Sequence, residues 1–294
     1  MTSVPPPFEH PGSPPPRPEL PEGAPLPEPA AVSGALLPPL GVPWWSPFVA
    51  LLATLTAVIV VAIVVGIFVG LDADQSDTVV TLVLTGVQFA ALVAAAWWTV
   101  QLFGGRPEPA AFGFAPTRPL PALGWTALAY LALWAATLVV VLGFGEPEEQ
   151  QLVQDIQDED ALGVLLAYGA LSCLVAPIAE ELFFRGFMFR ALAERLNVAW
   201  GALIAGVVFG ISHAAGSPAT SLIVLSVFGV SLCLLLWRTG SLIPCIMLHA
   251  FNNSISFGAT KELPWWGFIA VIVGSVGTTL LVSLLVARRR SAPA

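Results

Sequence analysis

The chain of 294 residues is 56% hydrophobic and only 10% charged, with a net charge of -8 at pH 7. A soluble globular protein carries about 25% charged residues, so this composition predicts a membrane protein, and the negative charge argues against a nucleic-acid partner. The three cysteines are odd in number and scattered through apolar sequence, which predicts neither a disulfide framework nor a zinc cluster.

The first 45 residues differ sharply from the rest. They contain 15 of the 27 prolines and few aromatic residues before Trp44. Such a segment cannot bury enough apolar surface to offset the entropy of ordering, so residues 1–45 are expected to form a disordered, proline-rich cytoplasmic tail. No basic region leads into a short apolar run, so we do not expect a cleavable signal peptide.

The remainder, residues 46–290, divides into apolar stretches about long enough to cross ~30 Å of hydrocarbon. We therefore predict an all-α fold, a polytopic membrane helix bundle of about eight transmembrane helices. The expected spans are 46–70, 79–103, 121–144, 161–184, 198–215, 219–237, 241–258 and 264–287.

The charged connectors between these spans predict an orientation. Alternate connectors are basic, with Arg106, Arg118, Arg190, Arg195, Arg238 and then Arg288, Arg289 and Arg290 after the last span. The intervening connectors are acidic or neutral, with Asp72, Asp74, Asp77 and the stretch 146–160; Lys261, beside Glu262, is the exception. Because cytoplasmic loops are enriched in Lys and Arg, this alternation predicts that both termini are cytoplasmic.

Three motifs bring ionisable residues into the apolar stretches. They are Glu180-Glu181-x-x-x-Arg185, Phe209-x-x-x-His213 and His249-x-x-x-Asn253. A charge near the bilayer centre costs a few kcal/mol even on lenient scales, so such residues are functional candidates. Two carboxylates, two imidazoles and an amide held together could activate a water molecule, which points to an intramembrane hydrolase.

The spacing of the motifs allows them to meet at one depth. Glu180 and His213 are 33 residues apart, and the polar turn at Leu196-Asn197 lies midway between them. A helical hairpin folded there places both residues about 16 positions, or ~24 Å, from the turn. His249 lies ~15 Å from the turn at Arg238, and the difference requires the fourth helix to extend beyond the membrane around 190–195. This helix should run unbroken past Arg185.

Helical spacing also suggests roles for these side chains. Glu181 and Arg185 lie at i and i+4, in the order that favours an ion pair, which leaves Glu180 to face a cavity as a general base. His249 and Asn253 share a helix face and could stabilise an oxyanion. The ring of Phe209 should pack beside the imidazole of His213. Gly206 and Gly210 are interpreted as close-packing positions.

The ordered motifs resemble those of the CPBP family, which includes CAAX-type prenyl endopeptidases and bacteriocin-processing or immunity proteases. The resemblance covers residues 160–260, the expected catalytic core. It implies that Glu180 and His213 activate water and that His249 and Asn253 stabilise the oxyanion, with Glu181 and Arg185 completing the first motif. It also implies hydrolysis of a peptide bond in a membrane-associated protein or peptide.

Metal dependence stays open in this family. No HExxH motif is present, but Glu180, His213 and His249 could in principle hold Zn²⁺. We favour a metal-free mechanism with no required cofactor.

Three other interpretations remain. Ser212 could be a rhomboid-like nucleophile with His249 as its base, although the glycine expected after that serine is missing. The Glu/His cluster could belong to a proton-coupled transporter, or to a non-catalytic immunity or scaffold protein. The composition, rich in Ala, Val, Leu, Pro and Gly, suggests a bacterial multi-pass protein of the plasma membrane, where a prenylated substrate is not expected.

Overall fold

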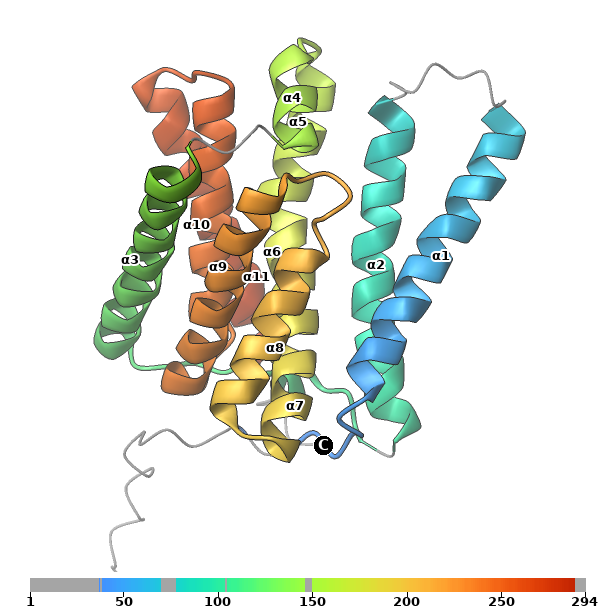
Figure 1. Cartoon of the computed structure of the whole chain (residues 1–294), viewed down its shortest axis with the longest axis vertical. Coiled ribbons are helices and arrows are strands. Elements are labelled where there is room, and N and C mark those ends of the chain that lie inside the picture. The colour runs from blue at the N-terminus through green and yellow to red at the C-terminus, as the bar shows by residue number, and fades with distance from the viewer. Residues whose placement is uncertain (1–36, 38, 70–77, 104, 146–149, 289–294) are drawn as a thin grey trace, which may run out of the picture. The chain divides into compact units, whose positions relative to one another are not determined.

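A computed structural model describes residues 37, 39–69, 78–103, 105–145 and 150–288, and its described part is helical with no strand (Figure 1). The long helices are α1 (Ser46–Val69), α2 (Thr78–Leu102), α3 (Pro119–Phe144), α8 (Val198–Ile211), α9 (Ala219–Thr239), α10 (Ile243–Thr260) and α11 (Trp265–Arg288). Short elements are the 3₁₀ turn η1 (Pro109–Phe112) and the helix α4 (Gln151–Asp158). Residues 1–36 and 38 of the predicted tail, and the predicted charges at 72–77, 146–149 and 289–290, lie outside the described residues. The last residues of the predicted tail are described, and Leu40 among them is buried against the bundle, contrary to the disorder expected up to residue 45.

The fourth apolar stretch forms one continuous 34-residue helix, Leu162–Arg195. It alternates between α-helical and π-helical turns: α5 (Leu162–Ala170), η2 (Leu171–Val175), α6 (Ala176–Glu180), η3 (Glu181–Phe189) and α7 (Arg190–Arg195). The helix therefore runs past Arg185 as expected. It turns at Leu196, and the Asn197 side chain accepts a hydrogen bond from the Trp200 backbone to begin α8. The predicted hairpin turn is confirmed.

Six helices of the described part are long and apolar enough to cross a membrane: Ser46–Phe68, Thr78–Leu102, Pro119–Phe144, Leu162–Arg195, Ala219–Thr239 and Trp265–Arg288. The chain is a multi-pass membrane protein. The fourth span, predicted at 161–184 as part of a longer helix, lies within the continuous helix Leu162–Arg195. Helix α8 has only 14 residues, and α10 carries a histidine and two asparagines, so the predicted count of eight stays a prediction.

Helix α8 ends earlier than the predicted limit of 215. Its last residue is Ile211, and the chain then turns until Pro218 precedes α9. The Ser212 hydroxyl and the His213 Nδ1 atom both lie within hydrogen-bond distance of the Phe209 carbonyl, at 2.7 and 2.8 Å. These side chains occupy the carbonyl that the His213 backbone N–H would use in a continuing helix, and so compete with the helical pattern.

Helices α8 and α9 pack at very short distance because glycines line their contact. A Cβ atom on Gly206 would lie 2.6 Å from the backbone nitrogen of Val230, and one on Gly210 would lie 2.6 Å from the carbonyl oxygen of Leu222. Both distances are too short for any side chain. The interpretation of Gly206 and Gly210 as close-packing positions is confirmed.

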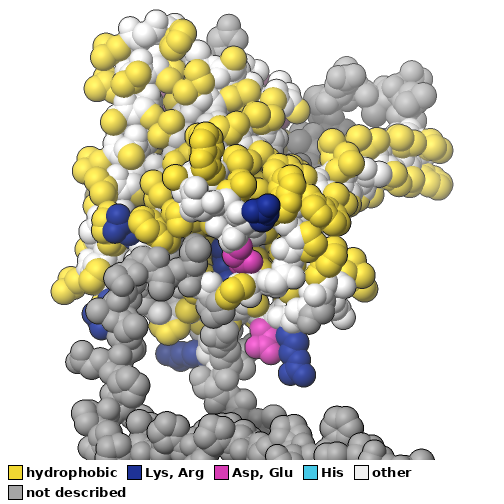
Figure 2. All heavy atoms as spheres, turned by 60° about the horizontal axis from the view of Figure 1, so that its bottom comes forward, with side chains coloured by type: hydrophobic (Ala, Val, Ile, Leu, Met, Phe, Trp, Pro, Cys, Tyr) yellow, Lys and Arg dark blue, Asp and Glu magenta, His cyan; other side chains and the backbone are white. Residues whose placement is uncertain are grey.

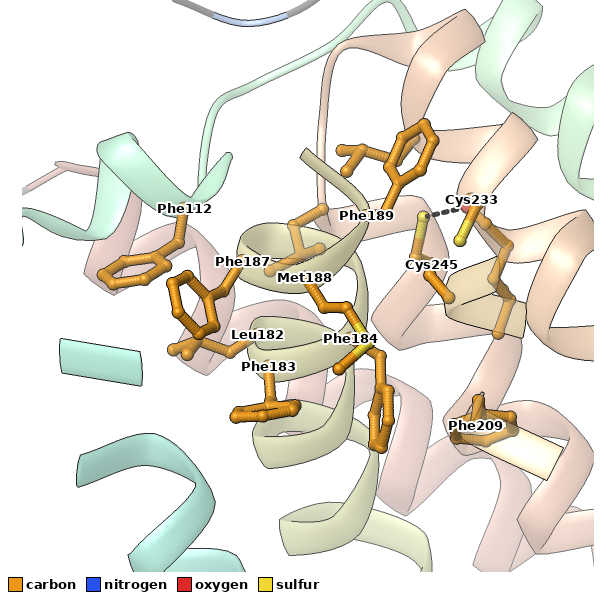
Figure 3. Packing of buried hydrophobic residues seen from close by; sticks show 14 of the residues in the cluster. Phe112, Leu182, Phe183, Phe184, Phe187, Met188, Phe189, Phe209, Cys233 and Cys245 are labelled. Atoms are coloured by element: carbon orange, nitrogen blue, oxygen red, sulfur yellow. Dashed lines mark hydrogen bonds between the residues drawn. The ribbon is translucent and has the colours of Figure 1, made fainter. Parts of the chain in front are cut away.

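The end of the fourth helix is enclosed by protein. Arg190 donates to the Ala111 carbonyl of η1, and the backbone N–H of Leu40 donates to Glu194 at 2.8 Å. Gly186 lies so close to η1 that a Cβ there would be 2.7 Å from the Phe112 carbonyl oxygen. Figure 3 shows Phe183, Phe184, Phe187, Met188 and Phe189 radiating from η3, with Phe112 beside them. The expected free extension at 190–195 is therefore largely buried, because η1 covers it.

Exposed basic side chains gather at the end of the bundle where this hairpin turns (Figure 2). They include Arg106, Arg118, Arg195, Arg238 and Arg288. Lys261 lies among the opposite connectors, where its ammonium donates to the Glu159 carbonyl at 2.8 Å. The predicted alternation of basic and acidic connectors thus separates the two ends of the bundle, as far as the chain is described.

Candidate active site

The long fourth helix and α10 bring the candidate charges together in the interior. Glu180 ends α6 and Glu181 begins η3. The exposed fractions are 7% for Glu180, 0% for Glu181 and Arg185, and 4% for His249. Burial of several ionisable groups is costly unless they satisfy one another. Their mutual contacts therefore define the site.

Glu181 is the shared partner in this cluster. Arg185 Nη1 donates to Glu181 Oε1 at 2.9 Å, so the predicted i, i+4 ion pair is present. His249 Nδ1 lies 2.7 Å from the same oxygen. An ionised carboxylate can only accept hydrogen bonds, so this contact places the proton of a neutral His249 on Nδ1. Glu181 thereby fixes both the tautomer and the orientation of the imidazole, in addition to balancing Arg185.

The other ring nitrogen of His249 faces Glu180. His249 Nε2 lies 3.8 Å from Glu180 Oε2, which is an electrostatic contact but too long for a direct hydrogen bond. The imidazole thus stands between the two carboxylates, tightly bound to Glu181 and loosely opposed to Glu180. Of the two glutamates, Glu181 forms the close ion pair, and Glu180 does not.

The helix that carries both glutamates departs from regular α-helical geometry around them. In η2 the backbone N–H of Ala176 donates to the Leu171 carbonyl, five residues earlier. Pro177 has no N–H to offer the carbonyl four residues before it, which favours such a shift of hydrogen bonds. A second π-helical segment, η3, begins at Glu181. Segments of this kind occur frequently at functional sites because they redirect side chains.

His213 lies in the turn after α8 and is half-buried. Its ring packs against Phe209 with centroids 4.9 Å apart, as predicted. The hairpin geometry predicts that polar atoms of His213 and Glu180 lie about 4–6 Å apart, close enough to share a water. The described contacts include no ion pair between them, and this separation stays a prediction. The structure instead joins His213 to the cluster through the ring of Phe209.

Phe209 contacts three of the six candidate residues, and its contacts with Arg185 and His249 were not predicted from the sequence. The Arg185 guanidinium lies 4.2 Å from its ring centroid, and the His249 ring lies 5.9 Å away. The side chain is 1% exposed. A guanidinium over a desolvated aromatic face is stabilised by about 2 kcal/mol. Phe209 therefore separates the two imidazoles and covers the buried cation.

Asn253 makes a contact that was not predicted. Its Nδ2 donates to the Ser172 carbonyl at 2.9 Å, and thereby ties α10 to the π-helical turn η2. An amide nitrogen carries two hydrogens, so one donor remains for another acceptor. The only sequence signal for Ser172 was a polar residue close to Pro177 in an otherwise apolar run.

Glu180, His213 and His249 could in principle hold zinc, and whether the protein binds a metal stays untested. Within the described ranges, no three His, Cys, Asp or Glu side chains are arranged to hold a metal ion. His249 already uses Nδ1 toward Glu181, and His213 uses Nδ1 toward the Phe209 carbonyl. The alternative nucleophile Ser212 donates to Phe209 and lies 3.3 Å from His213, and no contact of the described residues joins it to His249.

The fold and the site together define a polytopic membrane protein with a buried Glu–Arg–His cluster. Residues 162–255 match the family model described as Type II CAAX prenyl endopeptidase Rce1-like, and all six candidate residues lie within this range. This match covers about a third of the chain and agrees with the resemblance of the motifs to the CPBP family.

A curated relative also matches part of the chain. The chain is 32% identical over 115 residues to the Bacillus subtilis (strain 168) protein named "Putative membrane peptidase YdiL". The match covers 39% of this chain and 44% of the relative, so the chain spans less than half of that relative's length. No solved structure matches the chain significantly.

Proposed function

We propose that this protein is an intramembrane endopeptidase that hydrolyses a peptide bond of a membrane-associated protein or peptide. The observation that carries the proposal is the imidazole of His249 held between two buried carboxylates, 2.7 Å from Glu181 and 3.8 Å from Glu180. A structural ion pair needs one carboxylate for Arg185. The second carboxylate, opposed to a fixed imidazole, is what general acid–base catalysis requires.

In the proposed mechanism Glu180, assisted by His213, takes a proton from the attacking water. The hydroxide adds to the scissile carbonyl carbon. The resulting oxyanion accepts hydrogen bonds from the second amide hydrogen of Asn253 and from the Nε2–H of His249, which is the doubly protonated imidazolium in this step. The protonated Glu180 then gives its proton to the leaving amine as the C–N bond breaks. Glu181 and Arg185 act as positioning residues, because Glu181 orients His249 by accepting from its Nδ1–H and Arg185 balances the charge of Glu181.

We further propose that the reaction requires no metal. The described residues offer no set of three ligands, and both Nδ1 atoms are engaged by protein oxygens. Activity of the purified protein should therefore survive incubation with 1,10-phenanthroline and with EDTA. Loss of activity that added Zn²⁺ restores would contradict the metal-free mechanism.

The proposed location is a bacterial plasma membrane with both termini in the cytoplasm. Exposed arginines mark the end of the bundle that contains the hairpin turn at Leu196, and basic residues favour the cytoplasmic side. The bilayer is then the principal partner, and no nucleic acid is involved. Cysteine accessibility at Arg195→Cys and at Glu159→Cys tests this, since a membrane-impermeant reagent should label only the second in intact cells.

A cleavage assay distinguishes this function from the alternatives. The full chain is reconstituted in liposomes with a library of membrane-spanning peptides, and new termini are identified by mass spectrometry. Cleavage is expected with the wild type and with Glu108→Gln, a control at an exposed carboxylate, and should be absent with Glu180→Ala. Proton flux without cleavage would indicate a transporter. Peptide binding that Glu180→Ala leaves intact, again without cleavage, would indicate a scaffold.

A further inference from the structure

A pocket outside the candidate active site lies between α3 and α9. It has a volume of about 170 Å³ and is lined by Leu128, Ala129 and Ala132 of α3 and by Leu234 and Leu235 of α9. Leu128 is 54% exposed, so the pocket opens on the outer surface of the bundle. Pockets for drug-sized ligands measure about 300–1,000 Å³, so this one fits a segment of a chain rather than a whole molecule.

One end of this pocket carries a cation held by aromatic rings. The Arg238 guanidinium lies 4.6 Å from the ring of Trp125 and 4.2 Å from that of Trp237. Stacking of this kind covers the face of a guanidinium and leaves its N–H edge able to bind a planar or tetrahedral anion. No carboxylate of the described residues pairs with Arg238. The Arg238 guanidinium is thus exposed and held in place by the two rings, and it has no anionic partner in the part of the chain that the structure describes.

The position of the cation matches the level of lipid headgroups. Arg238 lies in the last turn of α9, at the end of the bundle where the other exposed arginines gather. From Trp125 the pocket continues along α3 as far as Ala132, seven residues or ~10 Å deeper into the hydrocarbon region. Hydrogen bonds from Thr117 to the Thr239 carbonyl and from Ser241 to the Ala115 carbonyl hold the two helix ends together. The mouth of the pocket is therefore preformed.

We propose that this pocket binds one acyl chain of an anionic phospholipid, with the lipid phosphate against the Arg238 guanidinium. The apolar walls and the surface opening suit a hydrocarbon chain from the bilayer. The single cation at the headgroup end selects lipids with net negative charge, to which a basic residue near the membrane surface is attracted. A free phosphate would use only the mouth and leave the apolar walls exposed.

Native mass spectrometry of the purified full chain tests this site without reference to catalysis. The protein is equilibrated with equal amounts of phosphatidylglycerol and phosphatidylcholine that have identical acyl chains. The first bound lipid is expected to be phosphatidylglycerol by about fivefold, the preference that one interfacial arginine supports. Arg238→Gln should abolish this preference, whereas Arg238→Lys should retain most of it. Arg118→Gln removes the same charge from the same end of the bundle and should leave the preference unchanged.

A second pair of variants tests the acyl-chain contact. Ala132→Leu fills the pocket and should remove the first tightly bound lipid of either type. Ala127→Leu, at an exposed position of α3 outside the pocket, should not. Equal loss of preference in Arg118→Gln and Arg238→Gln would overturn the proposal in favour of diffuse charge attraction. Displacement of the lipid by glycerol phosphate alone, or binding of a farnesylated peptide but of neither phospholipid, would also overturn it.

Discussion

Replacing Glu181 by glutamine tests the contacts of the buried cluster in a single step. Arg185 and Glu181 are both fully buried, and the carboxylate also holds His249. Breaking a buried ion pair by removing one partner costs about 3–5 kcal/mol, because the other charge stays uncompensated. Glutamine keeps the shape and one acceptor oxygen, and the ring of Phe209 still covers the guanidinium at 4.2 Å. We therefore expect the low end of this range, about 3 kcal/mol.

The assay is thermal unfolding of the purified protein in detergent. A domain of this size loses roughly 2–4 °C of Tm for each kcal/mol, so Glu181→Gln should lower the Tm by roughly 6–12 °C. Exposed Glu108 provides the control, and Glu108→Gln should leave the Tm unchanged. Activity of Glu181→Gln should fall as well, because His249 loses the charged acceptor that fixes its orientation.

A double variant separates the two effects. Replacing Glu181 and Arg185 together by leucine removes both charges, and such replacements of buried pairs are often neutral or stabilising. The Tm should return toward that of the wild type while activity stays low, since His249 still has no carboxylate at Nδ1. If the double variant is no more stable than Glu181→Gln, the charge-compensation argument is wrong.

Three further substitutions test the packing around the site. Gly186→Ala would place a Cβ 2.7 Å from the Phe112 carbonyl oxygen and should lower the free energy of unfolding by about 1–3 kcal/mol. Gly163→Ala, with open space around it, is the control and should be neutral or stabilising. Comparing the Tm values of the two variants checks both. Phe209→Leu should lower kcat about tenfold or more with little change in KM, because the ring orients two imidazoles rather than binding substrate; an unchanged kcat would exclude this role. Asn253→Ala should lower the free energy of unfolding by about 1 kcal/mol, because the hydrogen bond to the Ser172 carbonyl is lost. It should also lower kcat by about 10²-fold or more. An unchanged kcat would indicate that the role of Asn253 is purely structural.

The sequence predicted the features that depend on local pattern. The helices α1, α2, α3, α9, α10 and α11 begin and end within about two residues of the expected limits, because long apolar runs are bounded by charged or turn-forming residues. The Glu181–Arg185 pair and the contact between Phe209 and His213 follow from i, i+4 spacing on one helix. The turn at Leu196 was evident from four consecutive polar or turn positions between two apolar stretches.

Features that depend on tertiary packing or on backbone hydrogen-bond shifts were not predicted. Hydrophobic periodicity does not distinguish α-helical from π-helical turns, so the irregular geometry of η2 and η3 was missed. The contact between Glu181 and His249 joins residues 68 positions apart and depends on how α10 lies against the fourth helix. The short helix α4 was missed within an acidic connector. Leu152, Val153 and Ile156 do share one helix face, but eight residues are too few for a confident assignment from periodicity.

The central claim is that Glu180 is the general base of a peptide hydrolysis inside the membrane, and the kcat of Glu180→Gln tests it most directly. Glutamine preserves the size of the side chain but cannot accept the proton of the attacking water. A positioned general base contributes about 10²–10⁴-fold to the rate. The variant should therefore cleave at least about 100-fold more slowly than the wild type while keeping the same Tm and the same level of insertion into membranes. A kcat within a few fold of the wild type, for a protein equally well folded, would contradict the assignment.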